Sequence, residues 1–171
     1  DLVPAYKISD ASERVSAVDR SVLHTSFIMR SLSTAQRDDV LLLKQFLRAD
    51  SLYGAEIKIG GFSGYLCELL IVRYGSFPAS LRAATRWKGP VFIDIKGYHK
   101  DKKAISEAQE RFDSGFVVID PTDKNRNVSA AVSKDNLKRF ISICKAFLKK
   151  PTDRHFFKKP ETFDERVERS S

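Results

Sequence analysis

Residues 60–71 read GGFSGYLCELLI, and this stretch places three glycines directly before the most apolar run of the chain. A helix that is apolar on nearly every side is typical of the centre of a core, so we expect a central helix over residues 63–74. The glycines fit two uses: backbone amides that hold a phosphate at the start of a helix, or close packing of two backbones. The loop lacks the Lys-Ser/Thr ending of a P-loop, which favours close packing.

Helical periodicity continues on both sides of this stretch. Apolar residues recur at helical spacing, and Thr34 and Ser133 are suitable residues to begin helices. Leu66, Leu69 and Leu70 are expected to lie in the core. Besides the central helix, the expected helices cover about residues 21–31, 34–49, 77–87 and 133–148.

Strand patterns are fewer. Residues 91–95 and 116–120 are apolar and β-branched, and residues 2–8 form a further strand pattern that Pro4 restricts to a sheet edge. We interpret residues 96–103, which carry four lysines, as a solvated mobile loop, and residues 120–128 as a turn. These patterns predict an α+β fold that is mainly helical with a small β-sheet.

Composition limits the class of protein. The 171 residues carry a formal net charge of +8, which favours an anionic partner, most often a nucleic acid. No apolar run reaches the roughly 18 to 20 residues of a membrane span, and no signal-peptide pattern is present, so we expect a cytoplasmic protein with no membrane partner. Two cysteines within apolar helical patterns support neither a disulfide framework nor a zinc site. The chain begins at Asp1 without Met, and we interpret it as an excerpt of a longer protein.

Aspartates and one arginine lie at strand ends. Asp1, Asp94 and Asp120 could gather divalent metal ions, although strand-end aspartates more often only cap or solubilise, and the pattern does not supply a complete two-metal site. Arg126 follows the turn that begins at Asp120, where a guanidinium can bind a phosphate or a base edge.

Three other side chains are candidates for binding phosphate. His24 lies beside a helix start, and Lys44 and Tyr53 flank the end of the second helix. A structural hydrogen bond for His24 and a solvent-facing position for the other two are the alternatives.

Together these motifs resemble the archaeal-type CCA-adding enzymes, the tRNA nucleotidyltransferases that build the CCA end of tRNA from CTP and ATP. The resemblance covers nearly the whole chain and weakens in residues 96–103 and after Phe157. A weaker likeness extends to poly(A) polymerases and oligoadenylate synthetases. The motifs that carry the resemblance are DLVPAYKI, SAVDRSVLHTSF, LLLKQFLRADSLYGAEIKIGGFSGYLCELLIVRYGSF, RAATRWKGPVFIDI and FVVIDPTDKNRNVSAAVSKDNLKRF.

The resemblance implies a role for six residues. Asp1 matches the third catalytic carboxylate, which also binds metal. Arg126 matches an arginine that reads the incoming base together with tRNA phosphates. The other four residues match contacts to the triphosphate. Ser21-Val22 replaces the usual Thr-Pro, and the Gly-Ser motif and the other two carboxylates would precede the chain. The six residues are Asp1, Ser21, His24, Lys44, Tyr53 and Arg126.

The implied organisation has three parts. Residues 1–32 would form the last strand and helix of a nucleotidyltransferase head, residues 33–150 a central second domain, and residues 151–171 a charged linker to another domain. The implied reaction is attack of the tRNA 3′-hydroxyl on the α-phosphate of CTP or ATP with Mg²⁺ as cofactor. We expect the chain alone to be inactive. The alternatives are a non-catalytic RNA-binding module or another template-independent nucleotidyltransferase that resembles poly(A) polymerase.

Overall fold

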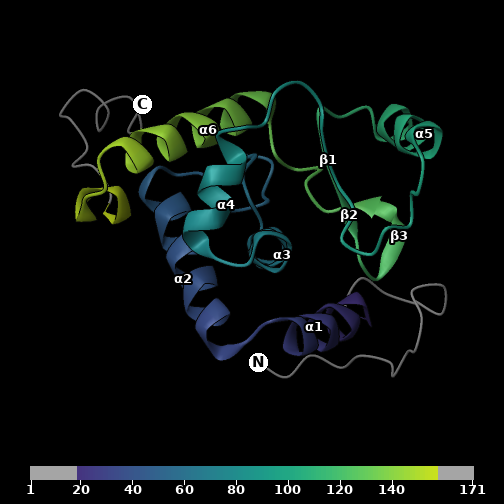
Figure 1. Ribbon diagram of the computed structural model, residues 1–171, viewed down its shortest axis with the longest axis horizontal. Helices are drawn as coiled ribbons and strands as arrows, with labels where there is room; N and C mark the ends of the chain where they lie inside the picture. The colour runs from purple at the N-terminus through teal and green to yellow at the C-terminus, as the bar shows by residue number, and fades with distance from the viewer. Residues whose placement is uncertain (1–18, 158–171) are drawn as a thin grey trace.

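The computed structural model describes residues 19–157. The expected strand over residues 2–8, the catalytic candidate Asp1 and the last part of the expected linker, residues 158–171, lie outside this range. The described part is α+β, as the sequence predicts: helices form most of it, and a small sheet lies beside the main group of helices, with one short helix beyond it (Figure 1). The helices are α1 (Asp19–Ser31), α2 (Thr34–Ala49), α3 (Gly64–Tyr74), α4 (Phe77–Ala84), α5 (Lys102–Phe112) and α6 (Lys134–Lys149), with a 3₁₀ helix η2 (Asp153–Phe156).

Serine side chains begin the helices that surround the core. The hydroxyl of Ser63 accepts from the amide of Leu66 at the start of α3, and the hydroxyl of Ser133 acts in the same way on α6. Helix α2 begins with a capping box, in which Ser33 and Gln36 each satisfy the other's backbone amide. Ser33 is therefore the cap of α2, and Thr34, the expected cap, is its first helical residue.

The sheet has the order β1-β2-β3, formed by β1 (Val91–Ile93), β2 (Phe116–Asp120) and β3 (Asp123–Asn127). Strand β2 runs parallel to β1 and antiparallel to β3, and all of its residues are buried. Helix α5 lies on the connection between the two parallel strands (Figure 1). Strand β3 forms within residues 120–128, which were expected to be a turn. Helix α5 was not expected, and it begins at Lys102, at the end of the expected loop of residues 96–103. Strand β1 and helix α4 end two or three residues earlier than expected, at Ile93 and Ala84.

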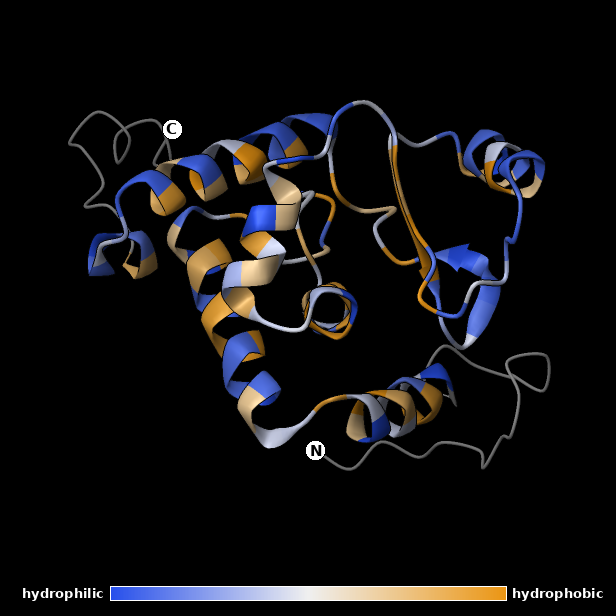
Figure 2. Cartoon of the chain, viewed as in Figure 1, coloured by the Kyte–Doolittle hydropathy of each residue, from blue (hydrophilic) through white to orange (hydrophobic). Residues whose placement is uncertain are grey.

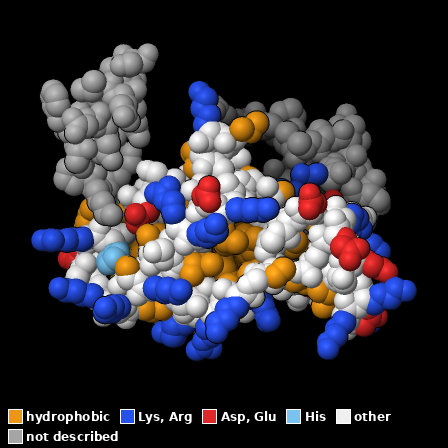
Figure 3. All heavy atoms as spheres, turned by 90° about the horizontal axis from the view of Figure 1, so that it is seen from above, with side chains coloured by type: hydrophobic (Ala, Val, Ile, Leu, Met, Phe, Trp, Pro, Cys, Tyr) orange, Lys and Arg blue, Asp and Glu red, His pale blue; other side chains and the backbone are white. Residues whose placement is uncertain are grey.

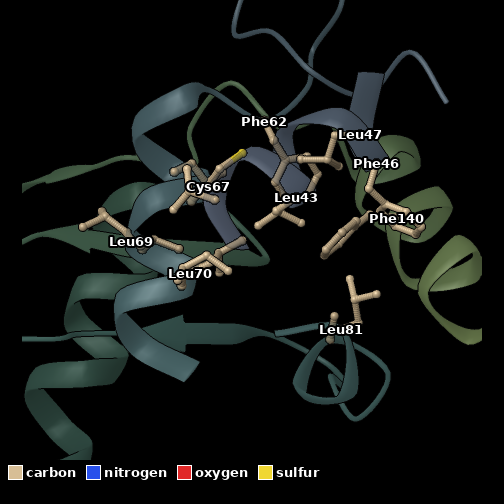
Figure 4. Close-up of a cluster of buried hydrophobic side chains, with 14 of the residues drawn as sticks. Leu43, Phe46, Leu47, Phe62, Cys67, Leu69, Leu70, Leu81 and Phe140 are labelled. Carbon is tan, nitrogen blue, oxygen red and sulfur yellow. The ribbon is translucent and has the colours of Figure 1, made fainter. Parts of the chain in front are cut away.

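One hydrophobic core joins the helices to the sheet. Figure 4 shows side chains from α2, α3, α4 and α6 meeting around Leu43, Leu81 and Phe140. Leu66, Leu69 and Leu70 of α3 are at most 1% exposed, which confirms the prediction of a central helix. Along the chain, hydrophobic residues dominate α3 and β2, whereas β3 is almost entirely hydrophilic (Figure 2).

The glycine loop before α3 packs backbone against backbone. The amide of Gly61 donates to the carbonyl of Gly54 at 2.9 Å, and the amide of Phe62 donates to the carbonyl of Leu52 at 2.7 Å. The amide of Gly60 donates to Glu56 at 2.8 Å. A Cβ on Gly61 would collide with the carbonyl oxygen of Leu52. Because these amides are already hydrogen-bonded within the protein, residues 60–62 serve close packing rather than phosphate binding.

Candidate functional site

Asp120, the last residue of β2, is fully buried and lies at the centre of a polar cluster. Its Oδ2 accepts from Nε2 of His24 and from Nη1 of Arg126, each at 2.8 Å. Its Oδ1 accepts from the backbone amide of Thr122 at 2.9 Å and from the side-chain hydroxyl of Thr122 at 2.8 Å. The same oxygen accepts from the hydroxyl of Tyr65 at 3.2 Å. One carboxylate thus connects α1, α3 and β3.

The local fold brings these groups together. Strand β2 ends at Asp120, the chain turns, and β3 returns antiparallel, which places Arg126 beside the carboxylate. Helix α1 contributes His24, which precedes Asp120 by 96 residues. A buried charge is stable only when it is paired and hydrogen-bonded, and each oxygen of Asp120 has at least two partners.

The electrostatics of Asp120 follow from these contacts. Burial alone would raise its pKa, but the hydrogen bonds from His24, Thr122 and Arg126 hold the pKa well below its usual value. Burial and the neighbouring carboxylate raise the pKa of the Tyr65 hydroxyl, which stays protonated and donates. Asp120 therefore remains an anion and an acceptor across the physiological pH range.

A cavity of about 250 Å³ opens beside this cluster, between α1 and α3. The ring of His24 stacks on Tyr65 at its wall, with centroids 3.8 Å apart. Residues of α1 form one side and two residues of α3, one turn apart, form the other. The lining residues are Ser21, His24, Thr25, Ile28, Met29, Tyr65 and Glu68.

Lys44 and Tyr53 lie next to the α3 side of this cavity. Nζ of Lys44 donates to Glu68 at 3.0 Å, and both side chains are mostly buried. A Cβ built on Gly64 would lie 3.1 Å from the hydroxyl of Tyr53 and 3.5 Å from Nζ of Lys44. Gly64, the first residue of α3, therefore leaves room for two of the predicted phosphate contacts.

The structure links all five of the described candidates to this region. Ser21 and His24 line the cavity. Lys44 reaches its wall through Glu68, and Tyr53 lies with Lys44 at Gly64. Arg126 is joined to His24 through the carboxylate of Asp120. The sixth candidate, Asp1, lies outside the described residues.

Sequence reasoning missed Tyr65 of the polar cluster and Glu68 of the cavity wall. Tyr65 and Glu68 are spaced three residues apart on α3, so they lie on the same face of a helix that is otherwise largely apolar. Two polar residues at this spacing in a core helix are the sequence feature that could have identified them as site residues. Asp120 was noted as a strand-end aspartate, but its role as an acceptor for His24 and Arg126 depends on contacts that the sequence does not display.

The lysine-rich segment after β1 is more ordered than expected. The carboxylate of Asp94 accepts from the backbone amides of Gly97 and His99 at 2.8 and 2.9 Å and from Nδ1 of His99 at 3.0 Å. These hydrogen bonds fix the first part of the segment. The hydroxyl of Tyr98 donates to the carbonyl of Pro121, directly after Asp120, at 2.7 Å. This segment therefore supports the turn between β2 and β3.

Within residues 19–157, no three or more His, Cys, Asp or Glu side chains gather in a way that could hold a metal ion. The oxygens of Asp120 already accept from protein donors. None of the described helices has the length and apolar character needed to cross a bilayer. Lys and Arg side chains are spread around the face seen in Figure 3, with hydrophobic atoms towards its centre.

Residues 38–158 match the model of the family described as tRNA nucleotidyltransferase, second domain. The chain belongs to this family. Helix α1, which carries Ser21 and His24, precedes the matched residues. Lys44, Tyr53 and Arg126 lie inside the tRNA nucleotidyltransferase second domain.

Named relatives of the chain are CCA-adding enzymes. The chain is 44% identical over 156 residues to the CCA-adding enzyme of Methanothermobacter thermautotrophicus, covering 91% of the chain and 33% of the relative. It is 46% identical to that of Methanoregula boonei, with 91% and 32% covered. It is 45% identical to that of Methanocaldococcus jannaschii, with 91% and 35% covered. The chain thus spans about a third of the length of these relatives.

Proposed function

We propose that the chain is part of a CCA-adding tRNA nucleotidyltransferase that adds CMP and AMP from CTP and ATP to the 3′ end of tRNA. Residues 1–32 would end the catalytic head, residues 33–150 would form the second domain, and residues 151–171 would lead towards another domain. The family match over residues 38–158 supports the second-domain assignment. Because η2 packs on α2, the first residues of the proposed linker lie against that domain.

The observation that carries the proposal is the convergence of cationic and hydroxyl side chains from α1 and the second domain on one cavity. His24 and Ser21 line it, and Lys44 bonds to the wall residue Glu68. A triphosphate is strongly anionic and accepts hydrogen bonds, so such donors bind it well. The cavity of about 250 Å³ would take the phosphates rather than the whole nucleotide.

Arg126 is proposed to contact the incoming base and tRNA phosphates. Nη1 of its guanidinium donates to the carboxylate of Asp120, and the side chain is 32% exposed. A guanidinium carries five N–H donors, so donors remain for a ligand after this ion pair. Its attachment to a buried carboxylate fixes its direction, as planar recognition of a base edge requires.

Mg²⁺ is the proposed cofactor, and the described residues do not fit it because they offer no group of three or more suitable ligands. In the proposed protein, Mg²⁺ would be held by Asp1 and by carboxylates that precede it, and would supply activation of the 3′-hydroxyl and stabilisation of the leaving oxygens. The described residues would bind the nucleotide and orient it. A cytoplasmic location accords with the proposed tRNA substrate.

The test is incorporation of labelled CMP and AMP into tRNA by the full-length protein. Arg126→Ala is expected to lower incorporation of both nucleotides by about tenfold or more, because a charged hydrogen-bond donor is worth about 1.5 to 3 kcal/mol. Arg82→Ala, which removes an exposed arginine from α4, is the matched control and should retain activity. Unchanged incorporation in Arg126→Ala would contradict the assignment. RNA binding that is sensitive to salt, without nucleotide binding, would instead support an RNA-binding module.

A further inference from the structure

The resemblance to CCA-adding enzymes implies no role for Asp120, and the sequence marks it only as a strand-end aspartate, yet two proposed ligand-binding side chains share one of its oxygens. His24 Nε2 and Arg126 Nη1 both lie 2.8 Å from Oδ2. The histidine comes from α1 and the arginine from β3, so a single carboxylate oxygen connects the two sides of the proposed site.

The exposure of the three groups shows how they are layered. Asp120 is 0% exposed, whereas the side chain of His24 is 15% and that of Arg126 is 32% exposed. The carboxylate therefore lies behind the two cationic or donor groups and is shielded by them. It is placed to orient both groups without touching a ligand.

Each hydrogen bond has a defined consequence for its partner. Because Nε2 of His24 faces an anion, that nitrogen carries the hydrogen and Nδ1 is left to face other partners. The stack on Tyr65 fixes the plane of the same ring. The ion pair fixes one end of the guanidinium of Arg126, which directs its remaining donors.

We propose that Asp120 is a positioning residue that holds His24 and Arg126 in a fixed relation, so that the triphosphate side and the base side of one nucleotide are bound together. This inference rests on the proposed function, since it takes these two side chains as nucleotide contacts. Asp120 acts through both residues and does not touch the nucleotide. Its substitution should therefore weaken binding of CTP and of ATP alike.

The first test uses nucleotide kinetics of the full-length protein. Asp120→Asn preserves the shape of the side chain and is expected to raise KM for both nucleotides about tenfold, with a smaller change in kcat. In an Arg126→Ala background the same substitution should raise KM by less than about threefold, because part of its effect is transmitted through Arg126. Asp39→Asn is the matched control: half-buried Asp39 of α2 accepts from the amide of Phe77 at the start of α4, so KM should not change.

The second test needs no activity and uses the 171-residue chain, whose three histidines simplify the spectrum. Proton and nitrogen NMR should show a hydrogen-bonded proton on Nε2 of His24, and on Nδ1 of His99, which pairs with Asp94 in the same way. Asp120→Asn should shift the His24 signal upfield, since a neutral amide is a weaker acceptor, and leave His99 unchanged. Asp94→Asn should have the reverse effect.

The outcomes separate this inference from the function on which it rests. An unchanged His24 signal in Asp120→Asn, or a tenfold effect that persists fully in the Arg126→Ala background, would overturn the positioning role. Loss of nucleotide affinity in His24→Ala and Arg126→Ala but not in Asp120→Asn would overturn it alone. Unchanged KM values in all three single variants would overturn the proposed function and this inference together.

Discussion

The imidazole of His24 lies almost parallel to the phenol ring of Tyr65, with 3.8 Å between the ring centroids and 11° between the planes. The two residues belong to α1 and α3, on opposite sides of the start of the family match. Both side chains also donate a hydrogen bond to Asp120. Helices α1 and α3 are therefore joined directly by the ring stack and indirectly through Asp120. Tyr65 is therefore a main support for the position of α1.

Substitution of Tyr65 should separate its ring from its hydroxyl. Tyr65→Phe retains the stack and loses one hydrogen bond to an ionised carboxylate, so we expect the free energy of unfolding to fall by about 1.5 kcal/mol. Tyr65→Ala also removes the partly buried ring and should cost about 2 to 4 kcal/mol. Urea unfolding of the chain measures both values. Equal losses in the two variants would show that the stack contributes little.

Lys44 should act mainly on nucleotide affinity. Its ammonium is held 3.0 Å from Glu68 at the cavity wall and would attract phosphate as a point charge. In the full-length protein, Lys44→Ala is expected to raise KM for CTP and ATP about tenfold and to change kcat little. Glu68→Gln added to that variant should change KM less than threefold, since Glu68 acts by holding the ammonium. A large fall in kcat with unchanged KM would contradict this role.

The extent to which the sequence predicts the fold depends on which contacts form each element. Helix α3 was predictable because its apolar residues and its serine cap are local features. Strand β3 reads DKNRN and has no strand pattern of its own. It forms because β2 offers a paired edge, and the side chain of Asn127 bonds to the backbone of Val118 at 2.9 Å and to that of Phe116 at 3.2 Å.

Helix α5 was missed for a different reason. Its apolar residues have helical spacing and Asp101 caps it, but the lysines around its start favoured a loop. The site is predictable only in part. The resemblance supplied the identities of His24, Lys44 and Arg126, whereas the convergence of α1 and β3 on Asp120 depends on contacts across 96 residues of chain.

Gly64 and Gly61 should respond differently to alanine. A Cβ on Gly64 would press on the ends of Tyr53 and Lys44, which can shift, so stability should change by less than about 1 kcal/mol while nucleotide affinity falls. A Cβ on Gly61 would collide with the backbone of Leu52, and Gly61→Ala should cost about 3 kcal/mol or more. Urea unfolding and nucleotide titration measure these effects.

Gly115→Ala is the control for this pair, since a Cβ there meets nothing within 4 Å. Its effect on both stability and nucleotide affinity should be small. Retained stability in Gly61→Ala would show that the glycine loop can move away from Leu52. Unchanged nucleotide affinity in Gly64→Ala would place the phosphates away from Tyr53 and Lys44.

The stability of the chain should depend on pH through Asp120. The pKa of this carboxyl is lower in the folded protein than in the unfolded chain, where it is about 3.9. Its contribution is therefore complete above the unfolded pKa and is lost as pH falls towards the folded pKa. Asp120→Asn should lower the free energy of unfolding by about 2 to 4 kcal/mol at pH 7. The difference from wild type should shrink below about pH 4; a difference independent of pH would contradict the ionised state.

The chain alone should have no nucleotidyl transfer activity. Two Mg²⁺ ions need several carboxylate oxygens in near-octahedral geometry, and residues 19–157 contain no group of three or more acidic, His or Cys side chains able to hold one. Asp94 and Asp120 already accept hydrogen bonds from His99 and His24. The assay is transfer of labelled AMP from ATP, with release of pyrophosphate, to tRNA that lacks its terminal A, with Mg²⁺ and the purified chain. Product above a no-enzyme control that persists through further purification would place a complete set of catalytic carboxylates within the 171 residues.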